Sequence, residues 1–195
     1  MNCSRLVLGV GLLALLTACA GTVTVPDDTE LEDPRPVFLL DHGRHASLVV
    51  TRADDSLIRY VYGDWRWYAR QETGFFRIFP TLFARTQAAL GRRELAGPPE
   101  SDALRRQIRV VIQEIHPLSV PAALIDELIA TLDARFEDAL ETLYYNRDYD
   151  LEFVHDPKPY TLGDNSNHVV AGWLRQLDID VSGNPVFGRW RVAGD

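Results

Sequence analysis

The N-terminal apolar run decides how much of this chain is available to fold into a domain. The run extends from Leu6 to Leu16 and is preceded by one basic residue, Arg5. A helix that crosses a bilayer needs about 20 apolar residues, so this run is too short to be an ordinary membrane span. A basic residue followed by a short apolar run is instead typical of a secretory leader. We therefore expect residues 1–18 to be a leader.

The residues at the end of the run, Leu16-Thr17-Ala18-Cys19, resemble a bacterial lipobox. The resemblance implies that Cys19 is acylated and becomes the first residue of the mature chain, and Ala20 resembles the pattern sorted to an outer membrane. Several acyl chains hold a protein stably at a membrane. We expect a lipid-anchored protein of the bacterial cell envelope, on the outer membrane and facing the periplasm. The alternative is a plain leader with an incidental cysteine.

The cysteine content limits the chemistry of the domain. Cys3 lies in the leader and Cys19 would carry the lipid, so no thiol remains for a disulfide, a zinc cluster or a cysteine nucleophile. Thr22–Pro36 is rich in proline and acidic residues and has no apolar period, which predicts that residues 19–36 form a flexible tether. Residues 37–195 would then form a single globular domain.

Charge and missing motifs exclude several functions. The net charge of −8 gives no electrostatic support for binding nucleic acid. The chain contains no GxGxxG, GxxxxGK[ST], GxSxG or HExxH motif, which removes support for dinucleotide binding, P-loop chemistry and zincin activity. We expect no cofactor.

Hydrophobic patterning predicts an α+β fold, with a small antiparallel sheet formed first and helices later in the chain. Residues 37–40 and 46–50 form one strand with a bulge or two strands. Further strands are expected at 57–62, 92–96, 106–115, 144–146, 150–154 and 186–192. Helices are expected at 75–90, from 119 past 136, and at 166–177.

His42 and His45 have a spacing that invites a metal interpretation. Residues three apart on one strand point to opposite faces, so the two rings converge only if Gly43 makes a bulge. The other histidines have no ligand spacing. We therefore expect no metal, but one buried, hydrogen-bonded ring and one exposed ring.

A second polar cluster runs from Asp164 to His168. Asp164 or Asn165 can cap a helix that begins at Ser166. The start of a helix also stabilises negative charge, as a nucleophile and its oxyanion require. His168 lies two residues after Ser166 and diverges from it on a helix, so a base must come from elsewhere. His45 is the natural candidate.

Two motifs resemble permuted papain-like hydrolases. The sequence His45-Ala46-Ser47-Leu48-Val49 after Gly43 resembles their histidine strand, and Asn165-Ser166-Asn167-His168 resembles the Asn-Cys-Asn-His nucleophile helix of the PPPDE peptidases. The combination of His-Gly-x-His-x-x-Leu-Val, Gly63-Asp64-Trp65 and the late Asn-x-Asn resembles a bacterial group, domain of unknown function 2459. In the permuted order the histidine comes first and the nucleophile last. The resemblance implies a permuted papain-like fold over roughly residues 37–177.

The resemblance also implies roles for single residues: Ser166 as nucleophile, His45 as base, and the Ser166 N–H as oxyanion donor. Serine stands where the family has cysteine, so the position is carried over but the activity is not. Asp64 or Asp41 would orient His45, and we favour Asp64. Four further residues are expected in the binding site: Asn165, Asn167, His168 and Trp65.

Aromatic residues are densest between Trp65 and Phe79. They are expected to pack in the core, with an apolar groove for an acyl chain or a peptide as the alternative. Three hypotheses then remain. The domain hydrolyses or transfers an acyl group on a lipid, a peptidoglycan peptide or a protein; it is a lipid-anchored binding or scaffolding module that has lost the chemistry; or it is a purely structural lipoprotein.

Overall fold

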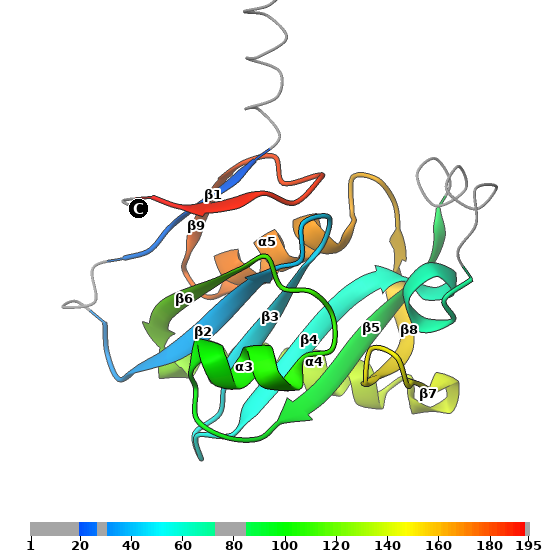
Figure 1. The fold of residues 1–195 in the computed structure, drawn as a ribbon, viewed down its shortest axis with the longest axis horizontal. Coiled ribbons are helices and arrows are strands. Elements are labelled where there is room, and N and C mark those ends of the chain that lie inside the picture. Colours follow the sequence, from blue (N-terminus) through cyan, green and yellow to red (C-terminus); the bar gives the residue numbers. More distant parts are fainter. Residues whose placement is uncertain (1–19, 27–30, 73–84, 194–195) are drawn as a thin grey trace, which may run out of the picture.

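The computed structural model describes residues 20–26, 31–72 and 85–193. Cys19 and the expected leader lie outside these residues, as does most of the helix expected at 75–90. The described part is an α+β domain with two sheets, which confirms the predicted class (Figure 1).

The larger sheet has seven strands in the order β6-β2-β3-β4-β5-β8-β7, and every neighbouring pair is antiparallel. Consecutive strands β2 to β5 form its centre. The strand bounds are β2 Pro34–Asp41, β3 Ala46–Thr51, β4 Leu57–Asp64, β5 Thr86–Leu95, β6 Glu114–Pro121, β7 Tyr144–Asn146 and β8 Leu151–Tyr160.

Helices cover both faces of this sheet. On one face lie α4 (Ala122–Glu137) and α5 (Ser166–Gln176), and on the other lies the short α3 (Ser101–Gln107), as Figure 1 shows. Successive side chains of a strand point to opposite faces of the sheet, and because helices cover both faces, both sets are buried. In β3, for example, Leu48 packs toward α4 and α5 while Val49 packs toward α3.

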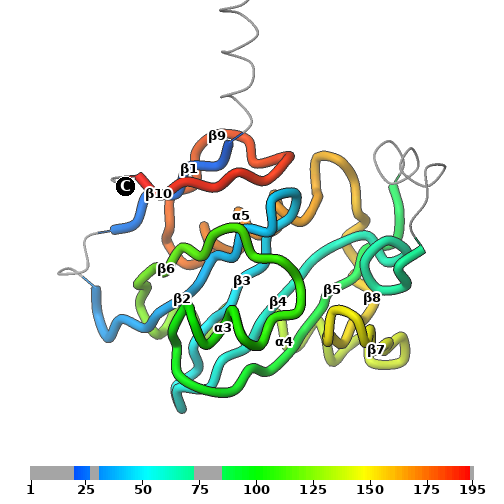
Figure 2. The backbone as a smooth tube through the Cα atoms, in the orientation of Figure 1, coloured from blue at the N-terminus to red at the C-terminus, as the bar shows by residue number. Residues whose placement is uncertain are grey.

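The second sheet joins the two ends of the described chain. Its order is β10-β1-β9, with β1 Gly21–Thr24 antiparallel to β9 Asp180–Gly183 and parallel to β10 Trp190–Val192. Figure 2 shows the first strand lying between these late ones. The prediction of a flexible tether at 19–36 is therefore wrong for Gly21–Thr24 and for 34–36 in β2. Val23 is fully buried and packs in the main hydrophobic core, and this packing against residues distant in sequence holds β1 in place.

Two further expectations about secondary structure are wrong. Residues 86–90 belong to strand β5 and not to a helix. Residues 106–115, expected as a strand, contain the end of α3, a connecting segment and only the start of β6. By contrast, the helix expected from 119 is confirmed from Ala122 onward, although residues 119–121 end β6. The helix beginning at Ser166 and the strands at 57–62 and 144–146 are also confirmed.

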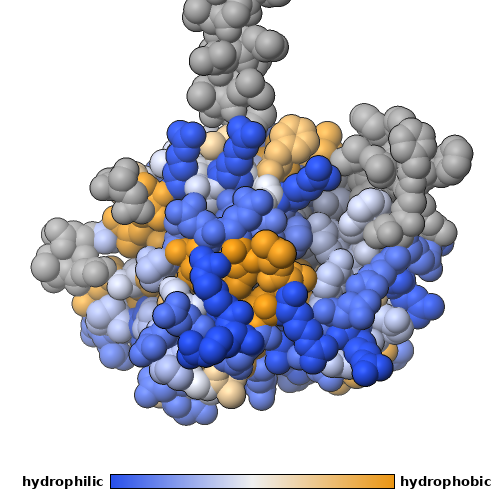
Figure 3. Space-filling view, in the orientation of Figure 1, coloured by the Kyte–Doolittle hydropathy of each residue, from blue (hydrophilic) through white to orange (hydrophobic). Residues whose placement is uncertain are grey.

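The connecting segment between α3 and β6 presents apolar side chains to the surface. Val111 is 79% exposed, and Figure 3 shows a compact hydrophobic patch over this segment. In the described part of the chain, no helix is long and apolar enough to cross a membrane. Two short helical turns complete the fold: the π-helical η2 (Trp65–Ala69) after β4 and η3 (Leu140–Thr142) after α4.

Candidate functional site

The turn between β2 and β3 carries both histidines of the first motif. Asp41 pairs with Ala46, and the His42 N–H donates to the His45 carbonyl at 3.0 Å, so Gly43 and Arg44 form a two-residue hairpin turn. Gly43 has φ +92°, a conformation that suits glycine at the first central position of such a turn. The two-strand alternative for residues 37–50 is therefore confirmed.

The hairpin brings the two histidine rings together. They stack with centroids 4.8 Å apart and an interplanar angle of 24°. The expectation that they diverge is wrong because they lie opposite each other across a turn, and not three apart on one strand. His42 is buried as expected, but His45 is half-buried and not exposed. No group of three or more metal-ligating side chains occurs among the described residues.

Hydrogen bonds fix the tautomer of His42. Its Nδ1 lies 2.9 Å from the Val111 carbonyl, which only accepts, so Nδ1 carries the proton. Its Nε2 then accepts from the Ser47 hydroxyl at 2.9 Å and lies 3.2 Å from Nη2 of Arg59. Burial, followed by the charge of Arg59, lowers the pKa of His42 to about 2, so this ring is neutral.

Arg59 is a buried cation beneath the histidines. It is 1% exposed; its Nε donates to the Ser47 hydroxyl at 3.1 Å, and its Nη1 has no hydrogen-bond partner among the described residues. Burial and the neighbouring Arg93 lower its pKa to about 9, which still leaves it charged at neutral pH. The sequence carried a signal for it, since Arg59 is the one charged residue within the apolar and aromatic run 57–62.

His45 is the more exposed of the two histidines in the hairpin. Burial is the largest cause that lowers its pKa to about 4, Arg59 lowers it further, and the carboxylate of Asp41 opposes the shift. The ring is therefore neutral at neutral pH and free to accept a proton. The rings of His45 and Tyr68 pack edge to face, with centroids 5.4 Å apart.

The second motif begins helix α5. Asn165 is the cap: its Oδ1 accepts from the backbone N–H groups of Asn167 and His168 at 3.0 and 3.2 Å. The N–H of Ser166, the first residue of the helix, is not among the groups capped by Asn165. Ser166 is only 2% exposed, and its side chain interacts with the hydroxyl of Tyr68.

Asn167 ties this helix to the histidine turn. It is fully buried, and its Nδ2 donates to the carbonyl of Arg44 at 3.0 Å. His168 faces the other way: its Nε2 lies 2.8 Å from Oδ1 of Asn184 and its Nδ1 3.1 Å from Oδ1 of Asn165. The structure therefore brings Ser166, Asn167 and His45 to one place, with His168 outside it.

Tyr68 links the two motifs, and the sequence marked it only as one of the aromatic residues between Trp65 and Phe79. It lies on η2, and its ring packs over Gly63, where a Cβ would come within 2.2 Å of Tyr68 Cδ2. Burial raises the pKa of its hydroxyl, so the phenol keeps its proton. Tyr68 thus touches both His45 and Ser166.

Asp64 makes hydrogen bonds that stabilise the local fold. Its Oδ1 accepts from the N–H of Trp67 at 2.8 Å and caps η2, and its Oδ2 accepts from the hydroxyl of Thr86. The carboxylate whose charge raises the pKa of His45 is that of Asp41, the alternative named from the sequence. Trp65 packs against His155 and Tyr144, with ring centroids 4.2 and 6.2 Å away, and Trp67 lines the pocket in its place.

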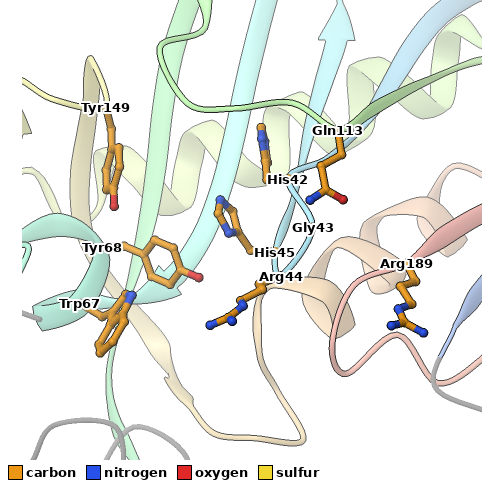
Figure 4. Close-up of a pocket in the computed structure, with 9 residues that line it drawn as sticks. All are labelled: His42, Gly43, Arg44, His45, Trp67, Tyr68, Gln113, Tyr149 and Arg189. Atoms are coloured by element: carbon orange, nitrogen blue, oxygen red, sulfur yellow. The ribbon is translucent and has the colours of Figure 1, made fainter. Parts of the chain in front are cut away.

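A pocket of about 580 Å³ opens over the histidine turn. Figure 4 shows three aromatic rings on one side, Gln113 and Arg189 on the other, and His45 with Arg44 between them. The lining residues are His42, Gly43, Arg44, His45, Trp67, Tyr68, Gln113, Tyr149 and Arg189. Ser166 is not a lining residue, and it contacts the pocket only through the lining residue Tyr68.

The arrangement can do two things chemically. A neutral imidazole and a hydroxyl at a helix start each contact the same phenol. These three groups are the components of a nucleophile, base and oxyanion site. The pocket beside them offers guanidinium groups and aromatic rings to a ligand. The chain matches no family model, no curated protein and no solved structure.

Proposed function

We propose that this domain hydrolyses or transfers acyl groups, with Ser166 as the nucleophile and His45 as the base, in a permuted papain-like arrangement. The observation that carries the proposal is the position of Tyr68, which contacts the side chain of Ser166 and the ring of His45. Tyr68 therefore places the helix start and the histidine turn around one point. The bond from Asn167 to the Arg44 carbonyl supports the same arrangement from the other side.

The reaction takes place in two steps. The Ser166 oxygen forms a bond to the carbonyl carbon of an ester or amide while its proton passes to the neutral ring of His45. The negative charge on the carbonyl oxygen is met by the Ser166 N–H at the start of α5 and by the Tyr68 hydroxyl. The bond to the leaving alcohol or amine then breaks, and His45 returns the proton to it. Water or a second acceptor then releases the acyl group by the same route in reverse.

A fluorophosphonate probe tests the proposal, because it labels a serine only when a base activates it. Mass spectrometry of the labelled protein should find the adduct on Ser166. His45→Gln should abolish the labelling, and Ser56→Ala, which changes a half-buried serine that precedes β4 and does not line the pocket, should not. Ser166→Cys adds a second measurement, since an intact site should lower the thiol pKa below its usual value of about 8.5. An unlabelled Ser166 together with an ordinary thiol pKa would refute the proposal.

A second function, a binding module without catalysis, is favoured by a different observation. Ser166 is 2% exposed and its side chain interacts with the Tyr68 hydroxyl. The Asp64 carboxylate caps η2 and is not directed to His45 by any hydrogen bond among the described residues. Under this alternative the pocket binds a ligand that the protein leaves unchanged. The probe experiment separates the two functions, because only the catalytic one requires Ser166 to react.

We also propose that the chain is a lipid-anchored envelope protein, on the basis of the Leu16-Thr17-Ala18-Cys19 sequence. Strand β1 begins at Gly21, so acylated Cys19 would hold the three-stranded sheet within about 7 Å of its anchor. Metabolic labelling with an alkyne-bearing fatty acid should mark the wild-type protein in membranes. Cys19→Ser should remove the label and release the protein, and labelling that survives this change would refute the anchor.

A further inference from the structure

The pocket beside Ser166 and His45 is positively charged in a chain whose net charge is −8. Arg44 and Arg189 line it, and its nine lining residues include no aspartate or glutamate. The ion pairs of the described residues engage other arginines, among them Arg35, Arg52 and Arg92, but neither of these two. Both guanidinium groups are therefore available to a ligand.

The backbone holds Arg189 at the pocket at a conformational cost. Its φ is +61°, in the left-handed region, and it is the only arginine there among the described residues. Left-handed geometry is unfavourable for a residue with a Cβ, and aspartate or asparagine tolerates it best. Two bonds maintain it: the Arg189 carbonyl accepts from the Gly21 N–H at 3.0 Å, and the Trp190 N–H donates to Oδ2 of Asp41 at 3.2 Å.

A third positive charge lies under the pocket. Arg59 is buried and contacts His42, which forms part of the pocket wall. The nearby carboxylate of Asp41 is already bonded to the N–H groups of Gly43 and Trp190. That carboxylate keeps its negative charge, but the three guanidinium groups of Arg44, Arg189 and Arg59 outnumber it, so an anion entering the pocket would be stabilised.

The opposite wall is aromatic. Trp67, Tyr68 and Tyr149 lie together across the pocket from Arg189, as Figure 4 shows. Such a wall accepts the flat or apolar part of a ligand. The pocket thus has one side for a charged group and one for the remainder of the molecule.

We propose that this pocket binds the anionic group of the substrate, a carboxylate or a phosphate, through Arg44 and Arg189. The inference rests on the proposed function and names the substrate class: an ester or amide whose acyl or leaving group carries a negative charge. Guanidinium groups bind carboxylate and phosphate through paired hydrogen bonds, so the two ligands share one chemistry.

Binding of simple anions tests the inference without any reaction. Inorganic phosphate and glutarate are titrated separately into the wild-type protein, and the imidazole NMR signals of His45 report occupancy. Replacing both arginines, Arg44→Gln with Arg189→Gln, should weaken binding at least tenfold. Arg191→Gln is the matched control, since Arg191 is exposed on β10 and does not line the pocket. Binding of glutarate alone would identify a carboxylate substrate, and binding of phosphate alone a phosphorylated one.

Two activated esters test the substrate class. The neutral ester is p-nitrophenyl butyrate and the anionic ester is the p-nitrophenyl monoester of glutaric acid. The ratio of kcat/KM for the anionic to the neutral ester should exceed one and should fall about tenfold in the double arginine variant. Anion binding without hydrolysis of either ester would refute the proposed catalysis and leave the anion site intact. Hydrolysis with no anion binding, or with an unchanged ratio in the double variant, would overturn the inference.

Discussion

The side-chain amide of Asn167 donates to the carbonyl of Arg44 at 3.0 Å, so the start of helix α5 is bonded to the turn that carries His45. The two residues are 123 positions apart in the chain. This bond aligns the proposed nucleophile with the proposed base, because Asn167 follows Ser166 directly and Arg44 precedes His45 directly. The same amide also lies 3.4 Å from the Val186 carbonyl.

Replacing Asn167 by alanine should therefore destabilise the domain. The change removes the bond from Asn167 to the Arg44 carbonyl, and loss of one intramolecular hydrogen bond costs about 0.5–1.5 kcal/mol. For a domain of this size we expect the Tm to fall by roughly 2–4 °C for each kcal/mol. Differential scanning calorimetry measures the shift. Ser182→Ala, on the exposed side of β9, should leave Tm unchanged, and an unchanged Tm for Asn167→Ala would show that the bond does not hold the two elements together.

The sequence predicted those parts of the site that depend on local signals. The start of α5 follows from the cap at Asn165 and from the helical spacing after it, and both act within a few residues. The strand expected at 92–96 covers the second half of β5, but its first half was missed because residues 86–90 favour a helix locally, whereas pairing with β4 and β8 decides their structure. The role of Asp64 was missed for a related reason, since its partner Thr86 comes from that same strand.

Gly63→Ala should disturb the site through Tyr68. The new Cβ would lie 2.2 Å from Cδ2 of that ring, so the ring must move away from its contacts with His45 and Ser166. Forcing a side chain out of a packed position costs about 1–3 kcal/mol. Urea unfolding measures the loss, and the probe labelling of Ser166 should change with it.

Gly172→Ala is the matched control for Gly63→Ala. Gly172 lies inside α5, and a Cβ there meets nothing within 4 Å. Alanine is favoured over glycine in a helix by about 0.5–1 kcal/mol, so this change should raise stability. If both glycine variants lost the same stability, the close packing of Tyr68 on Gly63 would not be the cause.

Acidification should destabilise the domain before its carboxylates titrate. The folded pKa values of His42 and His45 are lowered to about 2 and about 4, whereas an unfolded histidine titrates near 6.5. Between pH 6.5 and 5 the unfolded state therefore binds more protons than the folded state, and stability falls as the pH falls. Each histidine contributes a slope of about 1.4 kcal/mol per pH unit where its unfolded form is fully protonated.

Urea unfolding at several pH values measures that slope. His45→Gln removes one of the two titrating rings, so the dependence on pH between 6.5 and 5 should be about half as steep in this variant. The sign matters as much as the size. Stability that rises on acidification in this range, or a slope unchanged by His45→Gln, would contradict burial of neutral rings at the hairpin.

Arg59→Met should make His45 a stronger base. Arg59 is the second cause of the lowered pKa of His45, after burial, so removing its charge should raise that pKa while leaving it below 6.5. An NMR titration of the His45 ring measures the change. The fold should tolerate the variant, because methionine fills much of the same space and the Nη1 that is removed has no partner among the described residues. Ser47 and His42 lose their contacts with Arg59 but keep the hydrogen bond between them. Arg92→Met removes an equal charge from the opposite face of the sheet, where Arg92 packs over Phe136, and should leave the His45 titration unchanged. Equal shifts in the two variants would assign the low pKa to net charge, and no shift in either would assign it to burial alone.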